Sequence, residues 1–432
     1  MPEFNIEKAG FETRSLHAGQ KVDETTSRGV PIYRTSSYVF KSIEHAANLF
    51  ALKEFGNIYT RLMNPTTDVL EQRITALEGG AASVAVASGT SAVFYSVINV
   101  AKAGDEIVSA SNLYGGTYTM FDAILPDLGI NVKFADHKNP SSFEKLINEK
   151  TRALFIETIG NPVLDFTDID EISKIAKNHH IPLIVDATFT TPYLFRSIEH
   201  GADIVVNSLT KWIGGHGTAI GGIVTDAGNF DWSDNKFTLY TKPDKNYHGL
   251  RWALDLTDQL KKIAFALRFR TVPLRNLGAA ISPDNSWIFL QGTETLHVRM
   301  PRHSENALNV ALFLKNHPKV AWVRYPGLKD DPTYPIASKY LKKGFGGMVV
   351  FGVKGGRPSG EKLIESLRLF SHLANVGDAK SLALHPASTS HSQLSEEQQR
   401  EGGLTPDLVR LSIGLEDIND IKADLETALS KI

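Results

Sequence analysis

The feature that most constrains this chain is a regular alternation of short apolar segments with amphipathic ones between residues 82 and 206. The stretches between the apolar segments, such as residues 91–101 and 166–178, have the apolar spacing of a helix. The strands expected from this pattern are Ala82–Ala87, Glu106–Ala110, Asn131–Ala135, Ala153–Glu157, Pro182–Val185 and Asp203–Val206. Strand–helix alternation of this kind predicts an α/β fold with a mostly parallel sheet and helices packed on it.

The sequence on either side of this core predicts two further parts. Residues 1–63 are rich in turn-forming and polar residues, which is typical of an arm that packs on another surface. The large domain would span 64–288, with an insertion near 225–288 whose interleaved aromatic and basic residues favour an interface or a site-covering segment. A smaller C-terminal α/β domain would span 289–432. Its expected elements are a helix over 293–316, strands over 347–353 and 408–413, and a final helix.

Composition narrows the classes of protein that are possible. The chain has 432 residues, of which 42% are hydrophobic, so it can bury a large core. A formal net charge of −2 without a basic block argues against a nucleic-acid partner. The absence of cysteine excludes disulfides and a cysteine nucleophile. No apolar run has membrane-spanning length and the N-terminus lacks the apolar core of a signal peptide, so we expect a cytoplasmic protein without a membrane partner.

A lysine and an acid at the ends of two expected strands carry the clearest chemical signal. Asp186 ends the strand 182–185, and Lys211 follows the strand 203–206, with Ser208 and Thr210 just before it and a glycine-rich loop after it. Pyridoxal phosphate (PLP) needs a lysine to form its imine, an acid to hold its pyridinium proton and hydroxyls to bind its phosphate. Lys211 alone would fit an ordinary surface lysine, but Asp186 followed by Lys211 favours a PLP site.

Ser88, Gly89 and Thr90 lie where a strand ends and a helix begins. Glycine permits close backbone approach, and the start of a helix offers free N–H groups to a phosphate. Alone, these residues fit a plain helix cap. Together with Ser208 and Thr210 they would form the second half of a phosphate-binding cup.

Five other residues each allow a functional and a structural interpretation. Tyr114 could stack on a ring or fill a turn in the core, and Asn161 could bind the cofactor or a carboxylate, or simply form a turn. Arg410, inside an apolar strand, needs a carboxylate partner, which could be the substrate's or an internal one. Tyr59 and Arg61 could bind phosphate in a neighbour's site or lie in solvent. His216, His385 and His391 lack the spacing of metal ligands, so we expect no metal site.

Taken together, these stretches resemble the Cys/Met-metabolism family of PLP enzymes, which shares the aspartate aminotransferase fold. The core of the resemblance is Asp186–Pro192 followed by Ser208–His216, and the match runs from about Thr13 to the C-terminus. It implies that Lys211, Tyr114 and Asp186 are catalytic. The residues that it assigns to the cofactor are Tyr59, Arg61, Ser88, Gly89, Thr90, Tyr114, Asn161, Asp186, Ser208, Thr210 and Lys211, and those it assigns to the substrate are Asn161, Ser381 and Arg410. Tyr59 and Arg61 would come from the adjacent subunit, which implies a homo-oligomer with shared active sites, expected to be a tetramer.

Within the family, the O-acetylhomoserine sulfhydrylase branch is the most similar, over residues 264–283, 291–296 and 403–410. Gly116 stands where methionine γ-lyases typically carry a cysteine. The resemblance implies a γ-replacement that converts O-acetyl-L-homoserine and sulfide to L-homocysteine and acetate, in methionine biosynthesis.

The alternatives within the family are O-succinylhomoserine sulfhydrylase, cystathionine γ-synthase or γ-lyase, and methionine γ-lyase, and an aminotransferase shares the fold. Outside catalysis, the chain could be a PLP-fold binding protein. Retention of Lys211, Asp186 and Arg410 together argues against that alternative. No Gly-x-Gly-x-x-Gly follows the first strand, which disfavours a dinucleotide-binding oxidoreductase.

Overall fold

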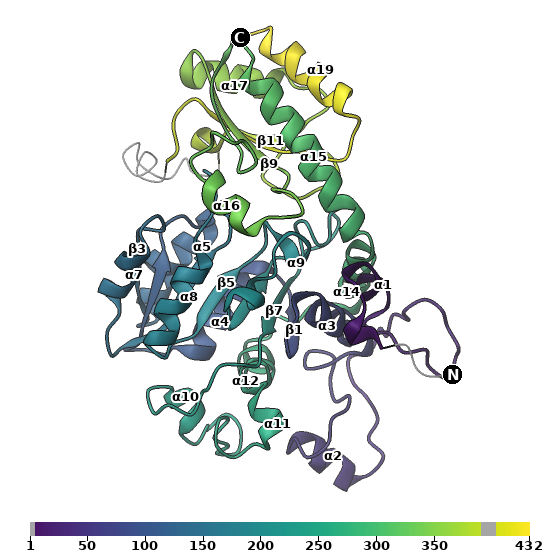
Figure 1. The fold of residues 1–432 in the computed structure, drawn as a ribbon. Helices are drawn as coiled ribbons and strands as arrows, with labels where there is room; N and C mark the ends of the chain where they lie inside the picture. The colour runs from purple at the N-terminus through teal and green to yellow at the C-terminus, as the bar shows by residue number, and fades with distance from the viewer. Residues whose placement is uncertain (1–4, 390–402) are drawn as a thin grey trace.

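The computed structural model describes residues 5–389 and 403–432, which form a seven-stranded sheet and a five-stranded sheet. A long helix, α15 (Leu296–Lys315), runs from the region of the larger sheet to the smaller one (Figure 1). The strands of the larger sheet are β1 (Ala82–Val86), β2 (Glu106–Ala110), β3 (Asn131–Ala135), β4 (Thr151–Glu157), β5 (Leu183–Asp186), β6 (Ile204–Asn207) and β7 (Gly222–Asp226). Six of these are the strands expected from the sequence, with ends that agree within two residues.

The larger sheet has the strand order β1-β7-β6-β5-β4-β2-β3. The strands from β6 to β3 in this order are all parallel, which confirms the predicted mostly parallel α/β sheet. The difference from the prediction is β7, which pairs antiparallel with both β1 and β6. It was not expected because only Ile223 and Val224 of its five residues are aliphatic, so no continuous apolar run follows the glycine-rich loop.

Helices pack against this sheet because their apolar faces need a partner. α4 contacts β1, β6 and β7, whereas α8 contacts β5. The helices of this part of the chain are α3 (Pro65–Glu78), α4 (Gly89–Val100), α5 (Gly115–Thr119), α6 (Leu125–Asp127), α7 (Pro140–Leu146), α8 (Ile169–Asn178), α9 (Thr191–Leu194), α10 (Thr238–Thr241), α11 (Asp258–Lys261), α12 (Ala264–Phe269), α13 (Arg275–Leu277) and α14 (Pro283–Glu294).

The smaller sheet has the order β10-β11-β12-β9-β8 and is antiparallel except for the β10–β11 pair. Its strands are β8 (Val320–Arg324), β9 (Met348–Val353), β10 (Ser371–His372), β11 (Leu382–Leu384) and β12 (Leu408–Ser412), and its further helices are α16 (Tyr334–Tyr340), α17 (Gly356–Ser366) and α19 (Ile418–Leu429). A second hydrophobic core lies between this sheet and its helices.

Helix α15 belongs to both cores. Leu296 and Met300, near its start, are fully buried in the core of the larger sheet. Ala307 and Leu314, further along, are fully buried in the second core. The predicted boundary near residue 289 falls inside α14, just before this shared helix, and the division into three parts stays a prediction.

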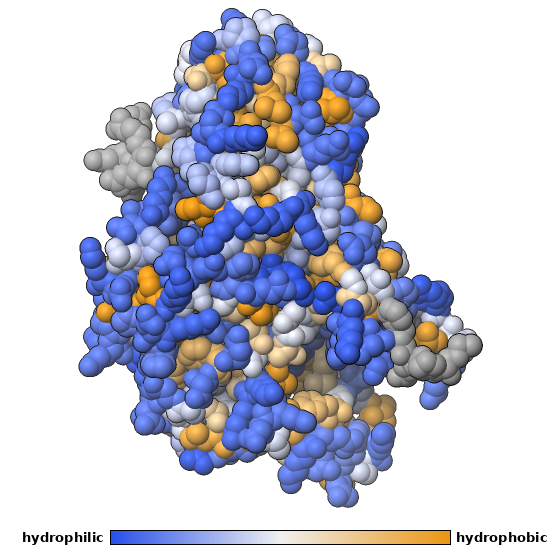
Figure 2. All heavy atoms as spheres, in the orientation of Figure 1, coloured by the Kyte–Doolittle hydropathy of each residue, from blue (hydrophilic) through white to orange (hydrophobic). Residues whose placement is uncertain are grey.

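The N-terminal arm contains two helices, α1 (Phe11–His17) and α2 (Ile43–Phe50). α1 packs against α3, whereas α2 stands apart from the two sheets (Figure 1). On the face shown in Figure 2, hydrophobic residues are scattered among a majority of hydrophilic ones. The arm nevertheless exposes several large apolar side chains, namely Leu16, Val22, Ile32, Tyr33, Val39, Phe40, Ile43, Phe50, Phe55 and Tyr59. Within the described residues, no helix is both long and apolar enough to cross a membrane.

Candidate active site

Three parallel strands bring the predicted lysine and acid to one edge of the larger sheet. Glu157, the last residue of β4, lies in register with Asp186, the last residue of β5. Asp186 in turn lies in register with Val206 of β6, and the turn that carries Lys211 follows directly. Ligands of parallel α/β sheets bind at this carboxyl edge, and the register places both Asp186 and the start of the turn that leads to Lys211 there.

Asp186 is partly withdrawn from solvent. One carboxylate oxygen, Oδ1, accepts a hydrogen bond from the backbone N–H of Thr188 at 2.9 Å. Burial raises the pKa of Asp186, because a charge is less stable away from water. A cation beside this carboxylate would restore its charge. The protonated nitrogen of a pyridine ring is such a cation.

Lys211 lies in a turn in which its own N–H donates to the carbonyl of Ser208 at 3.2 Å. Burial, followed by the charge of Arg410, lowers the pKa of Lys211 to about 8. Its amine donates to Oδ1 of Asn375 at 2.5 Å. An amine with a depressed pKa is available in its neutral, nucleophilic form near neutral pH.

The two halves of the predicted phosphate cup lie against each other. The Oγ of Ser88 caps α4 by accepting the N–H of Ser91 at 3.0 Å. A Cβ added to Gly89 would lie 2.6 Å from the Cβ of Ser208, so only glycine allows this approach. The backbone N–H of Ser208 donates to Oγ1 of Thr188 at 2.8 Å.

Thr210 and Thr90 complete this region in different ways. The hydroxyl of Thr210 donates to the carbonyl of Gly221 at 3.2 Å and lies 3.1 Å from the N–H of the same residue. Thr90 is exposed in the first turn of α4. Free N–H groups at the start of a twelve-residue helix, close to hydroxyl side chains, suit a phosphate.

Tyr114 and Glu157 are linked through the backbone. The N–H of Tyr114 donates to Oε1 of Glu157 at 2.7 Å, while Tyr114 as a whole is 52% exposed. Burial and the neighbouring Asp186 raise the pKa of Glu157 well above its ordinary value. The ring of Tyr114 is therefore held at the open side of the site and remains available for stacking.

Arg410 is almost fully buried in β12, with 7% of its surface exposed. Its Nη1 donates to Oδ1 of Asn161 at 3.2 Å, and burial lowers its pKa to about 10. Among the residues that the structure describes, no carboxylate forms an ion pair with it. A buried guanidinium with a neutral partner is suited to an external carboxylate, which it can bind with two hydrogen bonds.

Three residues that the resemblance assigns to the substrate or the cofactor form, within the described part of the chain, no hydrogen bond or ion pair with the rest of the predicted site. The hydroxyl of Ser381 donates to Oε2 of Glu416 at 2.9 Å and accepts the N–H of Gly414 at 2.9 Å, so its hydrogen bonds are made within the small domain. Tyr59 and Arg61 lie exposed in the arm, where the guanidinium is 5.2 Å from the centre of the tyrosine ring. These three assignments stay predictions.

Two of the three histidines considered as metal ligands in the sequence lie within hydrogen-bond distance of backbone carbonyls. Nδ1 of His216 lies 2.7 Å from the carbonyl of Gly214, and Nε2 of His385 lies 2.9 Å from the carbonyl of Pro406. His391 falls outside the described residues. Within residues 5–389 and 403–432, no three histidine, aspartate or glutamate side chains gather as metal ligands.

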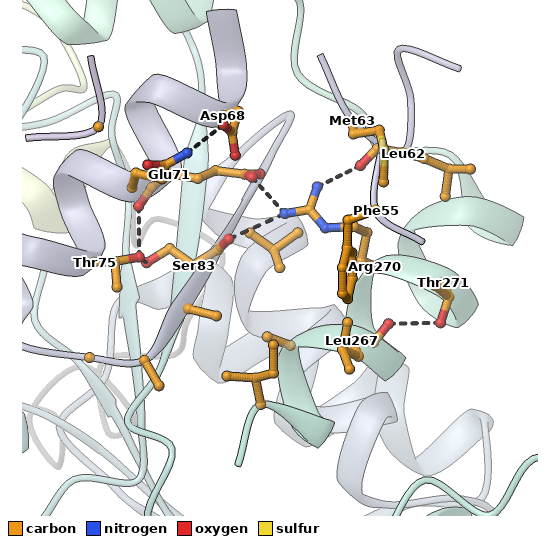
Figure 3. A pocket seen from close by; sticks show the side chains of 18 of the residues that line it. Phe55, Leu62, Met63, Asp68, Glu71, Thr75, Ser83, Leu267, Arg270 and Thr271 are labelled. Carbon is orange, nitrogen blue, oxygen red and sulfur yellow. Dashed lines mark hydrogen bonds and ion pairs between the residues drawn. The ribbon is translucent and has the colours of Figure 1, made fainter. Parts of the chain in front are cut away.

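A cavity of about 920 Å³, which none of the predicted site residues lines, lies between the arm, α3 and α12 (Figure 3). Arg270 crosses it and donates to the carboxylate of Glu71 at 2.5 Å and to the carbonyl of Leu62 at 2.5 Å. The hydrogen bond from Arg270 to Leu62 anchors the end of the arm, which carries Tyr59 and Arg61, to the large domain.

The sequence interpretation missed two residues next to Lys211. Asn375 follows no recognisable motif, and its contact with the amine comes only from the tertiary fold. Arg299, on α15, donates to the carbonyls of Trp212 and Ile213 at 2.8 and 2.9 Å. Arg299 could have been noticed, because it lies on the apolar side of its helix with Leu296 and Met300.

Comparison with known proteins agrees with this geometry. The family model for Cys/Met metabolism PLP-dependent enzymes matches residues 12–430. The chain is 55% identical to the O-acetyl-L-homoserine sulfhydrylase of Leptospira meyeri, over 98% of this chain and 97% of that protein. It is 49% identical to the homocysteine synthase of Schizosaccharomyces pombe, over 98% of this chain and 99% of that protein.

A solved structure, a putative O-acetylhomoserine (thiol)-lyase from Campylobacter jejuni, superposes with a TM-score of 0.94. It is 41% identical, covers 98% of this chain and 100% of its own, and carries a pyridoxyl-lysine phosphate at its position 205. The cup at Gly89 and Ser208, the half-buried Asp186 and the amine of Lys211 fit that cofactor. The chain belongs to the Cys/Met metabolism family of PLP-dependent enzymes.

Proposed function

We propose that this chain catalyses the PLP-dependent γ-replacement in which O-acetyl-L-homoserine and sulfide give L-homocysteine and acetate. The bond between the γ-carbon and the acetate oxygen breaks, and a bond from sulfur to that carbon forms. The observation that carries the proposal is that the buried Arg410 lies close enough to Lys211 for its charge to act on the amine, while Asp186 ends the strand next to the one that leads to Lys211. The names of the relatives, sulfhydrylase and homocysteine synthase, support this substrate class.

Bound PLP supplies an aldehyde and an electron-accepting ring. Asp186 keeps the proton on the ring nitrogen, and Lys211 holds the cofactor and moves the proton at the substrate α-carbon. Arg410, assisted by Asn161, binds the α-carboxylate and orients that carbon. Ser88, Gly89, Thr90, Ser208 and Thr210 bind the phosphate.

We further propose that the protein is a cytoplasmic homo-oligomer, a tetramer, in which Tyr59 and Arg61 complete the phosphate site of a neighbour. The ten large apolar side chains that the arm exposes among the described residues support a protein partner for it. A second copy of the chain is the partner that would place both residues in an active site. A chain without cysteine suits a reducing compartment.

The test incubates PLP-loaded protein with O-acetyl- or O-succinyl-L-homoserine, each without a thiol, with sulfide or with cysteine, and identifies the products. We expect sulfide-dependent homocysteine with little 2-oxobutyrate. Turnover of only the O-succinyl ester would indicate the succinyl branch, use of cysteine as the thiol would indicate cystathionine γ-synthase, and 2-oxobutyrate alone would indicate a γ-lyase.

Lys211→Ala should abolish both turnover and the absorbance band of the bound cofactor, because no other group would hold PLP covalently. A normal near-ultraviolet circular dichroism spectrum would show that the variant is folded. Substantial turnover in this variant would contradict the assignment of Lys211.

A further inference from the structure

The amine of Lys211 is held by a residue from the other sheet. Its Nζ donates to Oδ1 of Asn375 at 2.5 Å. Asn375 lies between β10 and β11 of the smaller sheet, whereas Asp186 and the cup residues belong to the larger one. The reactive nitrogen therefore lies between the two parts of the molecule.

The segment that carries Asn375 is fixed at two further points. The N–H of Gly377 donates to Oγ of Ser412 at 2.9 Å, on the strand that also carries Arg410. The N–H of Ala379 donates to the carbonyl of Gly215 at 2.8 Å, in the loop after Lys211. Asn375 is thus connected to the strand that would bind the substrate and to the loop of the lysine.

Gly377 shows how closely this segment approaches the lysine. Its φ is +79°, which favours glycine, and an added Cβ would lie 2.8 Å from the carbonyl carbon of Lys211. The backbone of this segment therefore lies against the backbone of Lys211. This close packing brings the side chain of Asn375 within hydrogen-bond distance of the lysine amine.

The chemistry of the acceptor matters as much as its position. A carboxylate within hydrogen-bond distance would stabilise the ammonium form and keep the proton on the lysine. The amide oxygen of Asn375 is neutral, so it can accept an N–H without adding a negative charge. The depressed pKa of Lys211, about 8, is therefore compatible with a fixed position of its amine.

We propose that Asn375 is a positioning residue for Lys211, whose amide oxygen holds the amine whenever the lysine is not bonded to the cofactor. The amine is thereby kept at the place from which it attacks the aldehyde or moves the proton at the α-carbon. The inference rests on the proposed function, in which Lys211 is the cofactor lysine.

The test follows the capture of PLP by full-length protein from which the cofactor has been removed. The amine condenses with the aldehyde and releases one water, and only the neutral amine attacks, so the capture rate against pH reports the ionisation of Lys211. For the unaltered protein we expect a midpoint close to the pKa of about 8.

Two substitutions change the acceptor while nearly keeping its shape. Asn375→Asp should move the midpoint up by about 1–3 pH units, because it places a negative charge beside the amine. Asn375→Leu should move the midpoint down, because the ammonium form loses its acceptor, and it should lower kcat with little change in KM. Asn316→Asp, at the exposed end of α15, makes the same charge change as a control and should leave the midpoint unchanged.

The outcomes separate this inference from the proposed function. Midpoints equal to that of the control in both Asn375 variants would overturn the inference, and so would a kcat of Asn375→Leu equal to that of the unaltered protein. If Asn375→Leu does not fold, Asn375→Ser, which keeps a shorter acceptor, should give an intermediate kcat. PLP capture by Lys211→Ala with the same absorbance band would instead refute the assignment of the lysine.

Discussion

At the scale of single residues, the site is built from charged groups that the fold leaves without their usual counter-ions. Asp186 has a raised pKa and Arg410 has only the neutral Asn161 as a partner among the described residues. Such arrangements cost free energy in the protein alone. Each of these charges is stabilised when a ligand group of opposite charge binds beside it. The unpaired charges of the site therefore predict the charges of its ligands.

Arg410→Met should lower kcat/KM for the amino-acid substrate roughly tenfold to a hundredfold, because a hydrogen bond to a charged group contributes about 1.5–3 kcal/mol. The affinity for PLP should stay unchanged, and fluorescence titration with the cofactor measures it. Arg410→Lys keeps the charge but loses the two-pronged geometry, so it should recover only part of the activity. Unchanged kinetics in both variants would exclude Arg410 from substrate binding.

At the scale of secondary-structure elements, Arg270, in the segment after α12, anchors the arm at the carbonyl of Leu62 while forming an ion pair with the buried Glu71 of α3. The guanidinium of Arg270 lies 2.5 Å from Oε2 of Glu71 and also binds the carbonyl of Leu62, just beyond Arg61 (Figure 3). Burial raises the pKa of Glu71, so the carboxylate depends on this partner for its charge. The insertion flagged in the sequence for its aromatic and basic residues thus contributes directly to holding the arm.

Arg270→Met should lower the free energy of unfolding by about 3–5 kcal/mol, because it leaves the buried Glu71 unpaired. The double variant Arg270→Met/Glu71→Gln should recover much of this loss, since the uncompensated charge is gone while an acceptor for the N–H of Ala85 remains. Urea unfolding of the two single variants and the double variant measures the coupling. Additive losses would show that the two residues do not depend on each other.

The sequence predicted the six strands of the large sheet that run in the same direction but missed the antiparallel strand β7. The apolar segments ending at Glu157 and Asp186 were found because buried parallel strands are continuously apolar. The antiparallel β7 was missed because only two of its five residues are aliphatic, so it leaves no continuous apolar run in the sequence. The position of Asn375 was missed because a contact between two sheets leaves no periodic signal in the chain.

At the scale of the whole molecule, two kinds of contact matter, those between the parts of one chain and those between chains. Within the chain, Asp165, in the loop after β4, accepts a hydrogen bond from the guanidinium of Arg324 of β8 at 2.7 Å. It also lies 3.0 Å from Nε2 of His137, in the loop after β3. These contacts connect the smaller sheet to loops of the larger one. Burial alone would raise the pKa of Asp165, but the hydrogen bonds from His137 and Arg324 hold it below its ordinary value. Between chains, the arm is the segment that we expect to cross.

Because its pKa is depressed in the folded protein, Asp165 contributes stability above its ordinary pKa of 3.8 and loses that contribution as the pH falls through the folded value. Asp165→Asn should therefore be less stable than the unaltered protein at neutral pH, by about 3 kcal/mol. The difference should shrink below about pH 4. Urea unfolding over a pH series measures it, and a difference independent of pH would contradict the role of this charge.

Shared active sites predict complementation between two inactive proteins. Arg61→Ala and Lys211→Ala should each have little activity alone, whereas co-expressed chains should regain up to about a quarter of the normal activity, because half of the random pairs carry one intact site. The control mixes the two variants after separate expression and purification, under conditions in which their subunits do not exchange. Absence of activity in co-expressed hybrids would place Arg61 in its own chain's site or outside any site.

The long helix α15 has one more consequence. Its first turns are part of one hydrophobic core and its later turns part of the other, and its Arg299 binds the loop of the lysine. If either core unfolds, half of α15 loses the side-chain packing that stabilises it. Because helix formation is cooperative, the other half of α15 is then destabilised as well. We therefore expect the two parts to denature in a single cooperative transition, so that a chain with one part unfolded and a working site in the other does not accumulate.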